Sequence, residues 1–196
     1  VLQMGFAMGV LFANISSSPF IMQQHYGFSA FEFSLFFGIN ALAIGVAAGL
    51  SVKFSNPEHA MFVGCVGMTL LSVIEFAALG LGCSFAVYEA LLFLLLFALG
   101  LTFTASTTLA MDCERANSGT ASALFGAAGF AFGGIVSPLV GLGDILTTTG
   151  LIFFVCSLCS LGFAVLALRQ THTGLWHSFK VRLIPVVRLD FLRRSK

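Results

Sequence analysis

The stretch that decides the fold of this chain runs from residue 119 to residue 143 and reads GTASALFGAAGFAFGGIVSPLVGLG. It contains no charged side chain, and about 20 apolar residues suffice to cross a bilayer as an α-helix. Its small residues recur three or four positions apart, which places them on one side of a helix. They are Gly119, Ser122, Gly126, Gly129, Gly133, Ser137 and Gly141. A face of small residues lets a neighbouring backbone approach closely, as helices do inside lipid, so this stretch predicts a tightly packed transmembrane helix.

The glycines and the proline of this stretch have separate expected roles. In a water-soluble helix each glycine would cost about 1 kcal/mol relative to alanine, so the membrane setting fits better. We expect Gly126, Gly129 and Gly133 to form the packing surface. Pro138 predicts a kink near the far end of the helix, where the Ser137 hydroxyl can bond a carbonyl that the proline leaves free.

The composition of the whole chain agrees with a membrane protein. Of its 196 residues, 58% are hydrophobic and 9% are charged, and the mean hydropathy is +1.02. Soluble domains carry about 25% charged residues. The net charge of +1 gives no indication of nucleic-acid binding. The composition therefore predicts a protein that crosses the lipid bilayer several times.

Six apolar spans account for most of the chain. They cover about residues 1–22, 31–52, 60–79, 87–111, 119–143 and 146–168. The alternating polarity of membrane β-strands is absent from the sequence. We therefore expect an all-α membrane protein, with a six-transmembrane-helix bundle over residues 1–169 and a basic tail over residues 170–196. The chain begins inside an apolar run, which suggests a piece of a longer protein.

The basic residues predict the orientation of the bundle. All nine Lys and Arg residues follow the second, fourth or sixth span, on one side of the membrane. The positive-inside rule assigns that side to the cytoplasm. We expect a multi-pass protein of the cell (inner) membrane with both termini cytoplasmic. Its tail is then either a solvated segment held near anionic lipid or a specific lipid or partner site.

Three segments carry a resemblance to a known family. They are SSSPFIMQ at residues 16–23 followed by YGFS at 26–29, FFGINA at 36–41, and GTASAL at 119–124 followed by SPLVG at 137–141. In order and spacing they resemble helices seven, eight and eleven of the major facilitator superfamily (MFS), specifically the bicyclomycin-resistance (Bcr/CflA) branch of drug:proton antiporters. The resemblance implies the C-terminal half of a twelve-helix fold. The implied partner is an N-terminal six-helix half, the substrate is an amphipathic small molecule, and a proton gradient supplies energy without a cofactor.

The chain also departs from that family. The loop after the second span keeps Gly49 and Lys53 of a degenerate gating motif but lacks its acidic partner. The basic tail is longer than the family's usual one. The acids that couple protons in related antiporters belong to the first half of the fold, so the resemblance assigns no coupling residue here.

Polar residues inside the spans are the candidates for a substrate cavity, which the resemblance places among helices seven, eight, ten and eleven. They are Asn14, Ser18, Asn40, Thr104 and Thr108. Asn14 and Ser18 stand four apart on one helical face, and Pro19 can open the backbone beside them. The alternative for the asparagines is interhelical hydrogen bonding, worth about 0.6 kcal/mol. The alternative for the threonines is a bond to their own helix carbonyls.

Glu75 is the one acid that the sequence places well inside a span. An ionisable group within the membrane is a functional candidate by default, and here the candidate role is proton handling. Glu75 lies about 7.5 Å from the outer end of its helix at 1.5 Å per residue. Snorkelling to the surface or simple protonation is therefore an alternative.

Catalysis and metal binding are not expected. Residues 141–144, GLGD, match the pattern of intramembrane aspartyl proteases, which need two carboxylates in one site. Asp144 and Asp112 fall at opposite ends of predicted spans, about 30 Å apart across the bilayer, so the pairing fails. Cys156 and Cys159 form a CxxC pattern inside a span, where they are expected to pack rather than to bind metal.

The favoured function is membrane transport by the C-terminal half of a proton-coupled multidrug efflux transporter. The alternatives are an MFS transporter of a small polar metabolite and a non-transporting six-helix scaffold or partner protein. Alternating access requires two halves that move about a shared site. We therefore expect residues 1–196 not to transport by themselves.

Overall fold

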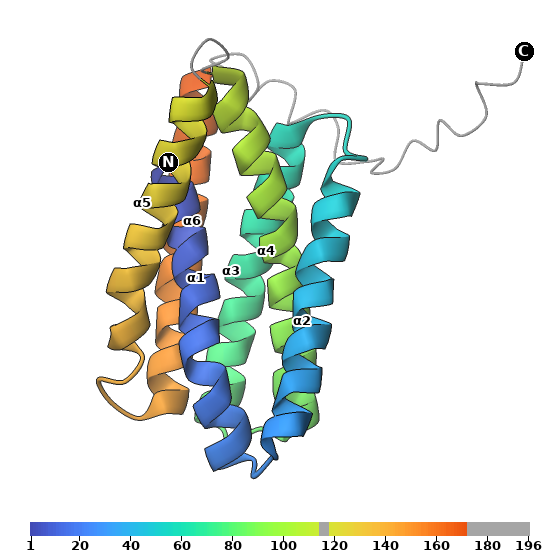
Figure 1. Ribbon diagram of the computed structural model, residues 1–196, viewed down its shortest axis with the longest axis vertical. Helices are drawn as coiled ribbons and strands as arrows, with labels where there is room; N and C mark the ends of the chain where they lie inside the picture. Colours follow the sequence, from blue (N-terminus) through green and yellow to red (C-terminus); the bar gives the residue numbers. More distant parts are fainter. Residues whose placement is uncertain (114–117, 172–196) are drawn as a thin grey trace, which may run out of the picture.

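The computed structural model describes residues 1–113 and 118–171, and these form a bundle of long helices (Figure 1). The elements are α1 (Leu2–Pro19), η1 (Phe20–His25), α2 (Ala30–Ser51), α3 (Pro57–Gly80), α4 (Phe85–Cys113), α5 (Ser118–Leu139) and α6 (Ile145–Thr171). Six helices in the described residues are long and apolar enough to cross a membrane, counting α1 with η1 as one. The expected all-α, six-helix fold is confirmed, whereas the predicted tail lies outside the described residues from position 172 onward.

Local capping chemistry sets where two of the helices begin. The Ser29 hydroxyl accepts a hydrogen bond from the Glu32 amide, and the Glu32 carboxylate accepts one from the Ser29 amide at 2.9 Å. This reciprocal capping box satisfies two amides that a helix start leaves unpaired. The Asn56 side chain caps α3 in a similar way, and Pro57 takes the first helical position. α3 therefore begins at Pro57, three residues before the expected start of its span.

The glycine-rich helix α5 ends earlier than the sequence suggested. It stops at Leu139, where residues up to 143 were expected to continue the span. Pro138 lies in its last turn and cannot donate a backbone hydrogen bond, so it marks the end of the helix rather than a kink within it. The expected role of Ser137 is also corrected, because its hydroxyl is hydrogen-bonded to Ser16 of α1 and not to a carbonyl of α5.

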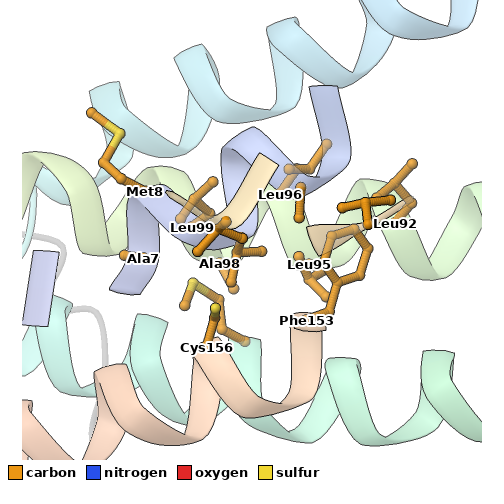
Figure 2. Packing of buried hydrophobic residues seen from close by; sticks show 14 of the residues in the cluster. Ala7, Met8, Leu92, Leu95, Leu96, Ala98, Leu99, Phe153 and Cys156 are labelled. Atoms are coloured by element: carbon orange, nitrogen blue, oxygen red, sulfur yellow. The ribbon is translucent and has the colours of Figure 1, made fainter. Parts of the chain in front are cut away.

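The bundle is organised around contacts of α1, α3, α4 and α6. α1 packs on α5 and α6, α3 packs on α4 and α6, and α2 packs mainly on α4. α5 and α2 thus lie at opposite edges of the bundle (Figure 1). Figure 2 shows the core that results, in which Ala7 of α1, Leu95 and Leu99 of α4, and Phe153 and Cys156 of α6 meet. Cys156 is a packing residue in this core.

The predicted glycine face of α5 is used in part. A Cβ at Gly129 would lie 3.0 Å from Met8, and a Cβ at Gly133 would overlap the ring of Phe12. Both positions therefore need glycine for the close approach of α1. A Cβ at Gly126 would have no neighbour within 4 Å, so this glycine takes no part in the contact.

The glycines on the exposed side of α2 do not make its contact with α4. Gly45 and Gly49 have no neighbour within 4 Å at a Cβ position. The close approach is made instead at Ile44 and Ala47, because Gly100 of α4 lies against the Ile44 backbone and the Ala47 side chain. Only one of two touching helices needs a glycine for backbone contact, and here the glycine belongs to α4.

Candidate functional site

The first part of the site is built where α1 gives way to η1. Ser18 donates a hydrogen bond of 2.6 Å to Asn14 Oδ1, and the two side chains are 1% and 2% exposed. Pro19 follows, and the chain continues through the π-helix η1 with a wider hydrogen-bond spacing, as in the 3.1 Å bond from the Tyr26 amide to Ile21. Single-turn π-helices of this kind are frequent at functional sites. The predicted pairing of Asn14 with Ser18 on one face is thus seen as a direct hydrogen bond.

Tyr26 joins this turn to the connection between α3 and α4. Its hydroxyl donates a hydrogen bond of 3.0 Å to the backbone carbonyl of Cys83. Burial, together with the bond to Cys83, raises the pKa of the Tyr26 phenol well above its ordinary value. Tyr26 therefore stays neutral and acts as a hydrogen-bond donor across the end of the bundle.

Glu75 of α3 lies fully inside the bundle. Its side chain has no exposed area, and neither carboxylate oxygen has a hydrogen-bond partner. Glu75 lies within electrostatic reach of Glu89, Tyr88 and Tyr26. An unpaired carboxylate buried in this way is costly, so the surroundings favour its neutral, protonated form. Snorkelling of Glu75 to the surface, the alternative considered above, does not occur.

Glu89 of α4 is a second carboxylate in the same place, and sequence reasoning missed it. Its Oε1 accepts a hydrogen bond of 3.0 Å from Asn40 Nδ2 of α2. Its other oxygen, Oε2, and the Asn40 oxygen Oδ1 are both buried without a partner. Glu89 lies four residues after the start of α4, so by sequence alone it is an acid near the end of a membrane span and not one within it. Its pairing with the predicted Asn40 depends on how α2 lies along α4. We call Asn40, Glu75, Tyr88 and Glu89 the carboxylate cluster.

A group of aromatic rings lies beside Tyr88 of the carboxylate cluster. Phe85, one turn before Glu89, lies with its ring centroid 4.3 Å from that of Phe28 and 4.8 Å from that of Phe36. Tyr26 is 5.4 Å from Phe85 and 5.8 Å from Tyr88 by the same measure. These rings therefore form an apolar surface next to Tyr88 at this end of the bundle.

The predicted cavity residues divide between two places. Asn14, Ser18 and Asn40 lie at the carboxylate cluster or next to it, since Ser18 lies near the Tyr88 hydroxyl. Thr104 and Thr108 lie farther along α4, where they line an open pocket of about 510 Å³. The Thr108 hydroxyl also bonds the Thr104 carbonyl at 3.0 Å, which is the helix-internal bond considered as the alternative. The pocket residues are Phe103, Thr104, Thr107, Thr108, Met111 and Asp112.

A second buried polar group, which sequence reasoning also missed, links four helices away from the carboxylates. Gln3 of α1 donates to Ser160 of α6 at 3.1 Å and to the sulfur of Cys65 of α3 at 3.4 Å. Its oxygen accepts from Ser106 of α4 at 2.7 Å, and Ser160 returns a bond to the Gln3 carbonyl. All these side-chain donors and acceptors have partners. We call Gln3, Cys65, Ser106 and Ser160 the Gln3 network.

The protease and metal patterns find no support in this geometry. Asp144 lies just before α6, where its carboxylate accepts hydrogen bonds from the amide and the hydroxyl of Thr147 at 3.0 and 2.8 Å. These bonds lower the pKa of Asp144 and fit a helix cap. In the described parts of the chain, no three His, Cys, Asp or Glu side chains are grouped so that they could hold a metal ion.

The arrangement defines a class of protein: a multi-pass helical membrane protein with ionisable groups inside its bundle. The chain is 32% identical over 158 residues to an uncharacterized MFS-type transporter, YdgK of Bacillus subtilis (strain 168). The match covers 79% of this chain and 39% of that relative, so the chain spans well under half of the relative's length. No family model matches the chain, and no solved structure matches it. The likeness supports membership of the major facilitator superfamily.

Proposed function

We propose that this chain forms the C-terminal half of a proton-coupled exporter of amphipathic drugs in the bicyclomycin-resistance branch of the superfamily. The observation that carries the proposal is the carboxylate cluster, because buried ionisable groups between membrane helices mark proton and substrate pathways. Glu75 and Glu89 supply the ionisable groups, and Asn40 extends the cluster to α2. The likeness to an MFS-type transporter supports membership of the superfamily, and the role as one half is part of this proposal.

The proposed partner is an N-terminal bundle of six helices. α2 and α5, at the two edges of the bundle, leave much of their apolar surface uncovered, including Leu42 at 68% exposure and Leu124 at 66%. In a membrane this surface meets lipid or another helical bundle. A second half seated beside α1, α2 and α5 would close a cavity whose wall includes the surroundings of Asn14 and Asn40, and the cell inner membrane is the proposed location.

Transport by the full-length protein tests the proposal. The protein is reconstituted in liposomes, a pH gradient is imposed, and the movement of a lipophilic cation such as ethidium is followed. We expect movement driven by the gradient and at least a tenfold loss in Glu75→Gln, with Glu32→Gln, an exposed acid of α2, as the matched control. Movement of small polar metabolites alone would favour the metabolite transporter, and no movement of either kind would favour a scaffold.

Residues 1–196 by themselves are expected not to transport. Alternating access needs two bundles around one site, and this chain supplies one wall. The same liposome assay applied to residues 1–196 should give the rate of empty liposomes. Transport that depends on the gradient and disappears in Glu75→Gln would contradict this expectation and indicate that copies of the chain form the second wall.

A further inference from the structure

The Asn40 amide and the Glu89 carboxylate share one hydrogen bond, and one oxygen of each group has no partner. A side-chain amide and a carboxylate are both planar, and each can make two hydrogen bonds along one edge. Here Asn40 Nδ2 donates to Glu89 Oε1 at 3.0 Å. Asn40 Oδ1 and Glu89 Oε2 remain, and both are buried without any partner. Both unpaired atoms are acceptors, so this pair of groups lacks one donor.

A single proton supplies that donor. When Glu89 Oε2 carries a proton, it becomes an O–H group that can donate to Asn40 Oδ1. The pair then has two hydrogen bonds, and both unpaired oxygens are satisfied. The proton comes from water, no covalent bond of the protein breaks, and the charge of Glu89 changes from −1 to zero. A proton on Glu89 Oε2 thus supplies the donor that Asn40 Oδ1 lacks.

The charged and titratable neighbours do not stabilise an ionised Glu89. Glu75 of α3, which its surroundings favour as the neutral acid, supplies no positive charge, and Tyr88 of α4 is buried beside both carboxylates. Tyr26 and Cys83, in the connections at the same end, are hydrogen-bonded to each other, and neither carries a positive charge. The side chains that α1 adds, Asn14 and Ser18, are uncharged.

The remaining elements add no compensating charge either. The part of α6 that packs near Glu75, residues 145–155, contains no titratable side chain. In the described parts of the chain, Lys and Arg occur only at Lys53 and Arg169, which lie at the other ends of α2 and α6. His25 at the near end acts electrostatically on Asp144 and packs edge-to-face against Tyr26. A buried carboxylate without a cation is held most easily as the neutral acid.

We propose that Glu89 and Asn40 form a proton-binding site, in which one proton taken up at Glu89 Oε2 closes a two-hydrogen-bond clasp between α2 and α4. The clasp adds a polar contact to the packing of α2 on α4, whose closest approach lies farther along, where Gly100 meets Ile44 and Ala47. Loss of the proton removes one of the two bonds and leaves both oxygens unpaired again. The protonation of Glu89 therefore sets how firmly α2 is held. This site does not depend on the proposed drug export.

Infrared difference spectroscopy of the full-length protein in liposomes tests the site. Acidification from alkaline to mildly acidic pH should produce the C=O stretching band of a buried, hydrogen-bonded carboxylic acid. The band should disappear in Glu89→Gln and persist in Glu32→Gln, which changes an exposed acid of α2 in the same way. In Asn40→Leu the band should remain but move to higher frequency, because the acid has lost its amide partner.

Each outcome decides for or against the site. Persistence of the band in Glu89→Gln, its absence from the wild-type protein, or an unchanged frequency in Asn40→Leu would overturn the proposal. If Glu89→Gln does not fold, as judged by circular dichroism and gel filtration, the frequency in Asn40→Leu still decides. The measurement requires no transport, so a failed transport assay and a failed proton site are separate results.

Discussion

The bundle contains two buried polar regions that differ in how their hydrogen bonds are satisfied. In the Gln3 network, the amide of Gln3 bonds Ser106, Ser160 and Cys65, and its donors and acceptors are paired. In the carboxylate cluster, Glu75 has no partner, and Glu89 and Asn40 share one bond where two could form. A satisfied network adds stability and fixes helix register, whereas unpaired buried groups reduce stability and persist where they serve a function. The difference supports a structural role for the first region and underlies the functional role that we propose for the second.

The largest expected effect comes from forcing apart the helices that carry the Gln3 network. A Cβ at Gly64 of α3 would overlap Thr102 and lie 2.8 Å from the Ala98 carbonyl of α4. Gly64→Leu should therefore lower the free energy of unfolding by about 3 kcal/mol, since backbone atoms cannot move aside. Unfolding by sodium dodecyl sulfate in mixed micelles measures this. Gly38→Leu, at a position of α2 with nothing within 4 Å, is the control and should change little.

Removal of the central side chain of the network should have the next largest effect. Gln3→Leu deletes three side-chain hydrogen bonds. At about 0.6 kcal/mol for each bond between membrane helices, the expected loss is about 2 kcal/mol in the free energy of unfolding. The same micelle titration measures it. A loss comparable to that of Gly38→Leu would mean that the network does not stabilise the bundle.

The matching change in the carboxylate cluster should have the opposite sign. Glu75→Leu replaces a fully buried, unpartnered acid with an apolar side chain of similar size. We expect the free energy of unfolding to rise by about 1 kcal/mol, because the penalty of an unsatisfied polar group is removed. Glu75→Gln, which keeps the polar atoms, should not show this gain. A loss in Glu75→Leu as large as that of Gln3→Leu would abolish the distinction between the two regions.

The smallest expected effect on stability comes from Asp144. This carboxylate lies outside the membrane spans, and it accepts hydrogen bonds from Thr147. Its bonds to Thr147 lower its pKa in the folded protein. The resulting stability is fully present above the ordinary pKa of aspartate and is lost as the pH falls through the lower folded value. Asp144→Asn should weaken this acid-range dependence, and Thr147→Ser, which keeps the hydroxyl, should not. Thermal unfolding between mildly and strongly acidic pH checks the comparison, and equal pH profiles of Asp144→Asn and wild type would contradict it.

Sequence and tertiary structure contributed different parts of this description. Length, apolar spacing and the absence of charge in stretches such as residues 119–143 predict six membrane helices, because hydrocarbon forces every backbone group to be paired within its own helix. The same periodicity predicts that Asn14 and Ser18 share a face, since that relation is local. Helix ends were less predictable, as the end of α5 at Leu139 shows.

Contacts between helices were decided by the tertiary structure alone. Both α2 and α4 carry glycines, but only the packed bundle shows that Gly100 makes the close approach while Gly45 faces outward. The sequence indicates only that Glu89 is an acid near a helix end. The register of α2 against α4 places Asn40 within hydrogen-bond distance of it. Hydrogen bonds between residues 49 or 103 positions apart depend on how helices cross. A helical period specifies which face a residue occupies, but the side chains of the neighbouring helix determine what that face meets.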